Sequence, residues 1–303
     1  MSNRYSLYSI KLNNALSLTQ IDRWGIQPNT NRSTIIPGGA IDPAHIGVGS
    51  GQPSITFATR DFSALFASAS ISAGLSCAAT STFIAQKRTE GGTFDNTSGS
   101  THLTLTCAKG FYYPTQITAS QDDNDGAVVE GTFVPLWDGT NDPIALNADQ
   151  AINSFSAPAF SSRYFLGPVY HAGAEVAGVT SITVDPGIRY EAKAFSGDPF
   201  PTHGAIYSRE PSLSFTVVDV DAADSLTALF GSAISTGLIF YLQKGVASGT
   251  RVAVGTSQHV KITAASGDWN MDDMSIQGND DGTVTFSGVP TTTLALVTNS
   301  AIP

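Results

Sequence analysis

Two stretches of this chain share one pattern of residues in the same order, and this repeat constrains the fold more than any other feature. The run Pro-Ser-Ile-Thr-Phe at residues 53–57, followed by Asp61, returns as Pro-Ser-Leu-Ser-Phe at residues 211–215, followed by Asp219. Further landmarks recur after about 160 residues. They are the Asp-Pro pairs at 42–43 and 198–199, the runs 71–75 and 234–238, and the acidic turns 122–126 and 279–282. We therefore predict an internal duplication, with residues 1–152 as the first copy and residues 153–303 as the second.

Each copy has the residue pattern of a β-rich domain. Residues 188–195 alternate as a half-buried strand does, after β-branched and small residues at 169–184 and a Pro-Gly turn. Further strands are predicted at 212–220, 237–243, 251–254, 260–265, 274–277 and 283–286. Residues 221–231 predict a short helix, which Asp221 can cap and Gly231 can end, and residues 61–67 are its shorter counterpart.

The fold class that follows is mainly β. We expect two tandem sandwich-like or barrel-like domains, each with about six or seven strands and one short helix beside them. Residues 152–162 are rich in Ser, Ala and Pro and are expected to link the two domains.

The chain carries few charges and is acidic, with 15 Lys and Arg against 25 Asp and Glu. The basic residues are dispersed, so no run predicts a surface that grips a nucleic-acid backbone. A charged fraction of only 13% indicates that partners bury much of the surface. No apolar stretch is long enough to cross a membrane and the first residues lack a signal-peptide core, so we expect synthesis in the cytoplasm and no membrane span.

Residues that could bind a metal or perform catalysis are scattered. The acidic turns 122–126 and 279–282 do not have the EF-hand spacing, and we expect them to be hairpin turns. The histidines have no metal-ligand grouping and are expected to be ordinary loop or surface residues: His45, His102, His171, His203 and His259. No nucleophile elbow or phosphate-binding loop occurs. We expect no cofactor, no metal site and no catalytic residue.

Cys77 and Cys107 both lie in apolar, strand-like runs and lack a CxxC spacing. Buried reduced thiols and a disulfide between neighbouring strands are both compatible with this pattern. The sequence leaves the choice open.

A duplicated β-rich domain with one short helix, long loops before the central strand, few charges and an acidic balance resembles the major tail tube proteins of tailed bacteriophages. The resemblance covers residues 16–150 and 170–302. It implies that the chain closes into trimeric rings with pseudo-sixfold symmetry, which stack into a hollow tube. It further implies that DNA passes without specific binding, and that tape-measure, tail-terminator and baseplate proteins are partners. The expected location is the virion tail, after assembly in the host cytoplasm.

Two groups of residues are candidate sites for this function. The loop at 27–51 and its counterpart at 196–209 are long and weakly periodic, and we expect them to be arms that stack one ring on the next. The candidates for this contact are Ser33, Ile36, Asp42, His45, Asp198, Phe200 and His203. Because a conduit must not hold DNA, acidic side chains should outnumber basic ones on its inner wall. The weaker candidates for this wall are Asp122, Asp123, Asp125, Asp280 and Asp281.

Other classes of protein compete with this interpretation. A head decoration, tail terminator or baseplate ring protein would share the same features. A glycan-binding β-sandwich module is a further alternative, since Trp24, Trp137 and Trp269 could each stack on a sugar, although such tryptophans more often lie in cores or interfaces. An enzyme is the least favoured class because no motif supports it. The sequence leaves open the host, the tail type and the exact ring stoichiometry.

Overall fold

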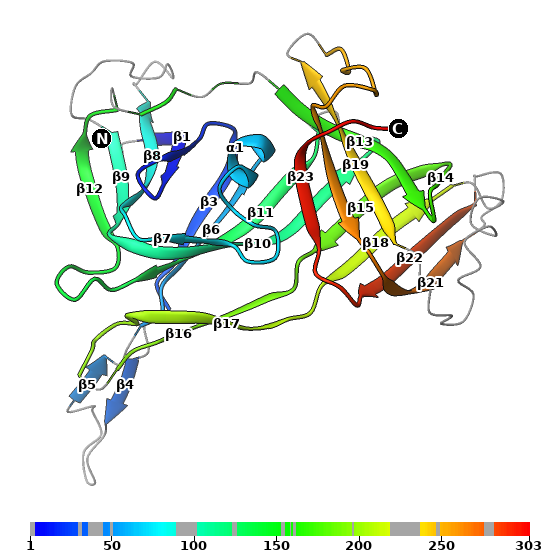
Figure 1. The fold of residues 1–303 in the computed structure, drawn as a ribbon. Coiled ribbons are helices and arrows are strands. Elements are labelled where there is room, and N and C mark those ends of the chain that lie inside the picture. Colours follow the sequence, from blue (N-terminus) through cyan, green and yellow to red (C-terminus); the bar gives the residue numbers. More distant parts are fainter. Residues whose placement is uncertain are drawn as a thin grey trace.

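The computed structural model describes residues 4–29, 32–35, 45–48, 51–88, 102–122, 126–152, 155–157, 159, 162–195, 197–218, 237–246, 249–275 and 282–303, with the backbone alone at 32–35 and 45–48. These residues form almost entirely antiparallel β-sheet, which confirms the predicted mainly β class. Figure 1 shows the two halves of the chain side by side, with the N-terminus on the first and the C-terminus on the second.

The first half carries a five-stranded sheet in the order β12-β9-β8-β1-β2. The inward residues of its central strands, such as Phe83 and Leu105, are fully buried. The strands are β1 (Arg4–Leu12), β2 (Leu16–Leu18), β8 (Ser81–Arg88), β9 (His102–Cys107) and β12 (Ala145–Gln150).

One long sheet runs through both halves and joins them. Its strands follow the path β21-β22-β18-β15-β10-β11-β6-β3, and β7 (Leu75–Cys77) pairs with the start of β10. The first half contributes β3 (Ile21–Gln27), β6 (Ser54–Thr59), β10 (Lys109–Ser120) and β11 (Val128–Leu136). The second half contributes β15 (Val179–Asp185), β18 (Ser212–Val217), β21 (Gly267–Ser275) and β22 (Thr283–Pro290).

The second half also carries a five-stranded sheet, in the order β14-β13-β19-β20-β23. Its strands are β13 (Ser162–His171), β14 (Ala174–Val176), β19 (Leu238–Val246), β20 (His259–Ala264) and β23 (Ala295–Ser300). Read from β2 to β12 and from β14 to β23, the two five-stranded sheets have the same strand order along the chain. This agreement supports the predicted duplication of residues 1–152 and 153–303, which remains part of our proposal below.

Positions in the two halves can be matched through the pairing registers. Tyr5 pairs with Lys87 between β1 and β8, and Tyr164 pairs with Lys244 between β13 and β19. We call two residues corresponding when they occupy the same place in the strand order and the same register. By this definition Tyr5 corresponds to Tyr164, and Lys87 corresponds to Lys244.

A single short helix, α1 (Phe62–Phe66), occurs among the described residues, where its first-copy counterpart was predicted. The Asp61 side chain makes no capping bond to this helix. Instead, its Oδ2 accepts hydrogen bonds from the backbone N–H groups of Thr19 and Gln20, so it ties the start of the helix to the segment between β2 and β3. The predicted helix at 221–231 and its Asp221 cap lie outside the described residues.

Several strand predictions need correction. Residues 251–254 were expected to form a strand, but they make only one isolated bridge, Gly245 to Arg251, before a turn. Of the strand predicted at 274–277, residues 274 and 275 are the end of a longer strand, β21, and residues 276 and 277 lie outside the described residues. The described strands also exceed the six or seven expected per copy, because short hairpins and the outer strands β12 and β23 escaped the sequence pattern.

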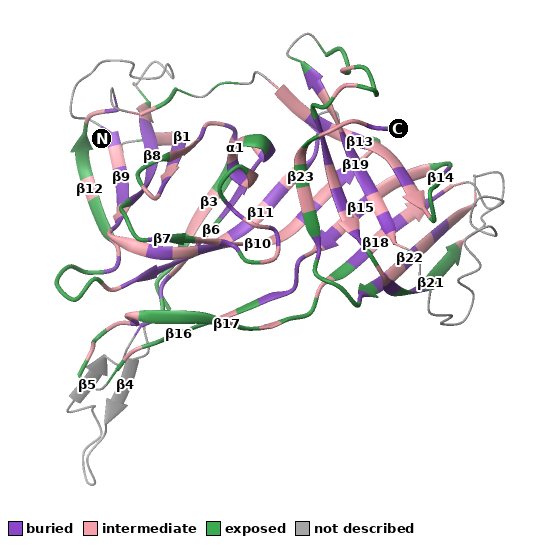
Figure 2. Cartoon of the chain, in the orientation of Figure 1, coloured by how far each residue is buried: buried purple, intermediate pink, exposed green. Residues whose placement is uncertain are grey.

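The hydrophobic core is continuous across the two halves. Figure 2 shows buried residues concentrated along the strands where the five-stranded sheets face the long sheet. In the first half, the Phe83 ring meets Phe57 and Phe133 edge-on at 6.0 and 5.7 Å. In the second half, Phe215 meets Phe240 at 6.0 Å and stacks on Phe286 at 5.2 Å. The same buried cluster includes residues of both halves, so the halves do not have separate cores.

Two histidines occupy corresponding buried positions, contrary to the prediction that all five are loop or surface residues. His102 and His259 are both 0% exposed. Nδ1 of His102 accepts a hydrogen bond from the Lys87 backbone N–H at 3.2 Å, and Nδ1 of His259 accepts one from the Lys244 N–H at 3.1 Å. Each ring thus satisfies a backbone donor at the end of a strand.

Replacing His259 is therefore expected to destabilise the fold. His259→Ala leaves the Lys244 N–H without its acceptor and opens a cavity, so the free energy of unfolding should fall by about 2–4 kcal/mol. The matched control is His203→Ala, because His203 is exposed, and its effect should stay within about 0.5 kcal/mol. Urea unfolding followed by circular dichroism measures both. Equal effects of the two substitutions would contradict the structural role of His259.

Cys77 and Cys107 are buried free thiols in this structure. Burial raises the pKa of Cys77 to about 11 and that of Cys107 to about 12. Since the thiolate is the reactive form, both thiols should be inert to alkylation at neutral pH in the folded chain. New cysteines on the surface can therefore serve as selective probes.

Candidate assembly surface

The junction between the two halves is a strand pair, β10 with β15. Ile117 pairs with Val184, and Ala119 pairs with Ile182. Ile117 and Val184 are both 0% exposed. The junction therefore combines backbone hydrogen bonds between two strands with burial of apolar side chains on the core side.

The two ends of the long sheet carry the residues that correspond to this junction. In the described part of the chain, β3 pairs only with β6 and β21 pairs only with β22. Ile26 on β3 corresponds to Val184, because Ile26 pairs with Ile55 as Val184 pairs with Leu213. Met274 on β21 corresponds to Ile117, because each pairs with a buried valine of the next strand, Val284 and Val129.

The two edge residues are more exposed than the junction residues to which they correspond. Ile26 is 36% exposed and Met274 is 44% exposed, whereas the corresponding Val184 and Ile117 are fully buried. At an unpaired sheet edge, an apolar side chain is exposed to water, and the backbone N–H and C=O groups have no partner strand. In the described part of the chain, the free edge β3 thus resembles the β15 side of the junction, and the free edge β21 resembles its β10 side.

A second contact between the halves lies beside the junction. The phenol ring of Tyr164, on β13, packs against Phe62 of α1 with ring centroids 5.5 Å apart, and its hydroxyl hydrogen-bonds to Ser63. The backbone N–H of Ala127 donates to the Tyr164 carbonyl oxygen at 2.6 Å. The first half therefore covers the start of β13 with its helix and with the chain segment that enters β11.

The predicted arms are hairpins rather than loops without structure. Within 27–51, β4 (Arg32–Ile35) pairs with β5 (His45–Val48). Residues 196–209 include β17 (His203–Arg209), which pairs with β16 (Ile188–Lys193). The weak periodicity concealed β17 because most of its residues are exposed. Figure 1 shows the β16–β17 arm reaching under the first half, toward β4 and β5.

The second arm is bound to the first half of the same chain. The Tyr190 ring stacks on Phe111 with centroids 4.4 Å apart and planes inclined by 6°. Near the tip, the Trp137 backbone N–H donates to the Pro201 carbonyl oxygen at 2.7 Å. Gly187 starts this arm with φ of +62°, and a Cβ there would lie 1.9 Å from the Glu210 carbonyl oxygen, so only glycine fits.

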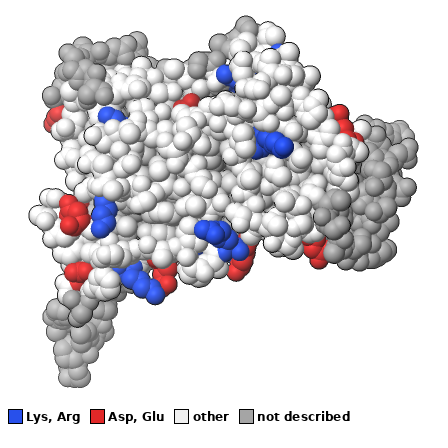
Figure 3. Space-filling model, in the orientation of Figure 1, with Lys and Arg blue, Asp and Glu red and all other residues white. Residues whose placement is uncertain are grey.

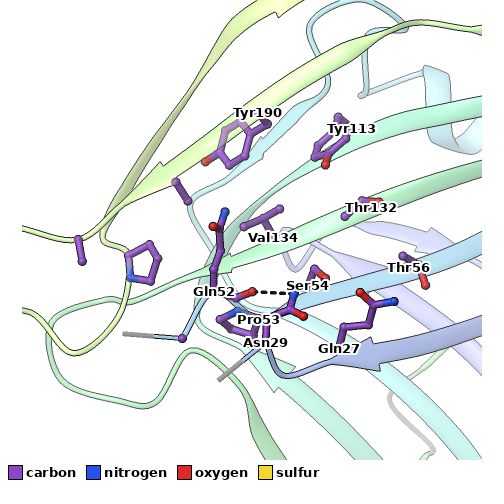
Figure 4. A pocket seen from close by; sticks show the side chains of 14 residues that line it. Gln27, Asn29, Gln52, Pro53, Ser54, Thr56, Tyr113, Thr132, Val134 and Tyr190 are labelled. Atoms are coloured by element: carbon purple, nitrogen blue, oxygen red, sulfur yellow. Dashed lines mark hydrogen bonds between the residues drawn. The ribbon is translucent and has the colours of Figure 1, made fainter. Parts of the chain in front are cut away.

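Between this arm and the first half lies an open groove of about 620 Å³. Figure 4 shows Tyr113 and Tyr190 on one side and amide and hydroxyl side chains, including Gln27, Gln52 and Ser54, on the other. Asn29 Nδ2 donates to the Gln52 carbonyl oxygen at 3.1 Å and so connects the two strands at the base of the first arm. The fourteen residues that line the groove include no carboxylate, histidine, lysine or arginine.

The second arm covers a surface of the first half around Val134, and the corresponding surface of the second half is exposed. Val134, beneath the arm, is 4% exposed, whereas the corresponding Val289 is 57% exposed. The correspondence holds because Val134 pairs with Phe111 as Val289 pairs with Asp268. Val289 is thus a third apolar residue that lacks the cover its counterpart has.

The residues predicted for the arms lie in different elements of the structure. Ser33 lies in β4 and His45 in β5, where His45 pairs with Ile35, while Ile36 and Asp42 lie outside the described residues. At the tip of the second arm, Thr202 Oγ1 donates to Asp198 at 3.3 Å, and the exposed His203 packs edge-on against Phe195 at 4.9 Å.

The remaining candidate of this group, Phe200, is half-buried beside the tip residues. That these residues form contacts between stacked rings stays a prediction.

The face of the long sheet that points away from the core is coated with hydroxyl groups, and we call it the hydroxyl face. Its serines and threonines are Ser54, Thr56, Thr118, Ser120, Thr132, Ser181, Thr183, Ser212, Ser214, Thr216, Thr283, Thr285 and Ser287. Some of these groups bond across strands, as Thr216 does with Thr285 at 3.3 Å. The alternation of the strands sets this face, because every second residue points away from the core.

Charges on the hydroxyl face are few and mainly acidic. Arg23 forms an ion pair with Glu130, so its charge is compensated locally. Asp185, Asp268 and Asp273 add carboxylates on the described strands, and Lys109 adds one further cation. In the view of Figure 3 charged side chains are also sparse, and several Lys or Arg side chains lie next to an Asp or Glu.

Of the predicted wall residues, only Asp122 is described. It is exposed in the turn after β10, where its backbone N–H donates to Ser120 Oγ at 3.3 Å. The other four, Asp123, Asp125, Asp280 and Asp281, lie outside the described residues. Sequence reasoning missed Glu130, Asp185, Asp268 and Asp273, which strand alternation could have indicated once the strands were correctly bounded.

No group of three His, Cys, Asp or Glu side chains that could hold a metal occurs among the described residues. In the same residues, no helix is long and apolar enough to cross a membrane. No protein family model matches the chain, and no curated protein matches its sequence. The geometry of the sheet edges, the arms and the hydroxyl face therefore carries the functional argument.

Proposed function

We propose that this protein is the structural subunit of a phage tail tube, a duplicated tube domain that closes into rings and stacks into a hollow conduit for DNA. The observation that carries the proposal is the pair of exposed edges, Ile26 on β3 and Met274 on β21, which correspond to the buried junction pair Val184 and Ile117. When β3 of one copy pairs with β21 of the next, every copy repeats the contact that joins its own halves.

This contact is head-to-tail, so it closes into a ring or continues as a helix. Two tube domains per chain make a trimer the stoichiometry that gives six domains around the axis. Ring closure would leave the long sheet without free edges, which removes the aggregation hazard of unpaired strands. The first arm of one copy would then cover Val289 of its neighbour, as the second arm covers Val134 within the chain.

The hydroxyl face is the proposed inner wall. The five-stranded sheets and α1 cover the other face of the long sheet, so they would lie on the outside of the ring. A wall of serine and threonine with an excess of carboxylates offers DNA no array of cations, and therefore no binding through counterion release. The tape measure would lie in the same lumen, and the terminator and baseplate proteins would meet the ends of the tube.

Negative-stain electron microscopy of the purified protein tests this proposal. We expect rings, or tubes made of stacked rings, with a central hole. A homogeneous population of monomers at concentrations far above those used for microscopy would contradict it, and would favour the glycan-binding alternative. Rings that never stack would favour a terminator or baseplate ring protein instead.

A further inference from the structure

An open pocket of about 590 Å³ lies at the end of the first half's sandwich, between β1 and the edge strand β3. The residues that line it are Tyr5, Ser6, Leu7, Trp24, Ala85, Arg88 and Leu103. Five of these residues have apolar or aromatic side chains, and Ser6 and Arg88 add polar groups, so the open pocket exposes a mixed surface. Mixed apolar and polar surfaces of this kind are typical of contacts between protein chains.

Five lining residues correspond to residues buried in the second half. Tyr5, Leu7 and Ala85 match Tyr164, Leu166 and Leu242 through the β1–β8 and β13–β19 registers. Leu103 matches Val260 through the next strand pair, and Trp24 matches Ile182, since Trp24 pairs with Phe57 as Ile182 pairs with Phe215. All five counterparts are at most 7% exposed.

The first half supplies the cover for these counterparts. Phe62 and Ser63 of α1 contact Tyr164, the Ala127 N–H binds the Tyr164 carbonyl oxygen, and Ala119 of β10 pairs with Ile182. In the second half, the position that corresponds to Ala127 is Gly282, which precedes β22 as Ala127 precedes β11. Gly282 thus repeats one of the covering positions on the second half, at the far end of the molecule from the open pocket.

We propose that the pocket of Tyr5, Leu7 and Trp24 is a docking site for the second half of another copy of this chain, which covers it with Gly282 and the end of β21. The inference rests on the proposed ring and identifies a contact beyond the paired edges.

Leu7→Asp tests this docking site, because a carboxylate in the pocket must lose its water when the neighbour covers it. We expect the variant to keep its circular dichroism spectrum and thermal transition, and its rings to dissociate at concentrations at least about tenfold higher than wild type in sedimentation velocity. The matched control is Val297→Asp, since Val297 lies exposed on the outward face of β23. It should assemble as wild type does.

A second readout does not depend on the aspartate variant folding. The emission spectrum of assembled protein is compared with that of dissociated protein, for wild type and for Trp24→Phe. We expect a shift to shorter wavelength on assembly in wild type, and its loss in Trp24→Phe.

If wild-type rings form but Leu7→Asp assembles normally and Trp24 emission does not move, the docking site is wrong and the proposed function stands. If wild-type protein forms no rings, both are wrong.

Discussion

Val184→Asp is expected to unfold the chain, whereas Ile26→Asp, the same change at the corresponding edge position, is expected to leave it folded. Val184 is fully buried in the β10–β15 junction, and a carboxylate there would have no partner. The expected loss in the free energy of unfolding exceeds about 4 kcal/mol. Ile26 is already 36% exposed, so the aspartate at that position keeps part of its hydration.

Thermal and urea unfolding of the two variants, measured at low protein concentration, compare these effects. Ile26→Asp should lose no more than about 1 kcal/mol in the isolated chain. Similar stabilities of the two variants would show that the junction between the halves does not depend on the β10–β15 contact. The measurement is informative whether or not the chain forms rings, since it concerns the subunit alone.

Substitutions of the edge residues should weaken ring formation strongly, although they leave the isolated chain folded. Ile26→Asp or Met274→Asp is expected to weaken ring assembly by at least about a hundredfold, because each removes apolar burial and places a carboxylate in a strand interface that excludes water. Mixing the two single variants should not restore rings, since each copy contributes one defective edge to every ring. Sedimentation velocity across a concentration series measures this loss.

A charge elsewhere on the surface controls for the added carboxylate. Val254→Asp changes an exposed apolar residue outside the sheet edges, and it should assemble as wild type does. Rings that form equally well in Met274→Asp would contradict the edge contact.

The sequence predicted the elements that depend on local pattern. The mainly β class followed from alternation, and α1 was predicted as the shorter counterpart of the helix expected at 221–231. Most of each landmark, residues 54–57 and 212–215, lies in β6 and β18, which hold the same place between their neighbours, β11 and β3 or β22 and β15. Equal places in a sheet call for similar residues, so the shared pattern at these positions could be recognised from the sequence.

Other features depend on contacts that no local pattern contains. In the second arm, the alternation at 188–195 predicted β16, but its partner β17 was missed, because most residues of β17 are exposed. The burial of His102 and His259 follows from an N–H donor on the neighbouring strand, which the spacing of histidines cannot indicate. The edges were not predicted because Ile26 and Met274 are ordinary apolar residues until their counterparts are known to be buried.

The most direct test of the account is a disulfide between the two edges of different copies. In Ile26→Cys/Met274→Cys protein, mild oxidation of assembled rings should link each copy to the next, and denaturing electrophoresis without reductant should show a ladder that ends at a closed trimer. Cys77 and Cys107 are buried and should not contribute. Each single-cysteine variant should remain monomeric on the gel. We expect efficient cross-linking only in the double variant, and an assembled double variant that stays monomeric after oxidation would contradict the edge-to-edge ring.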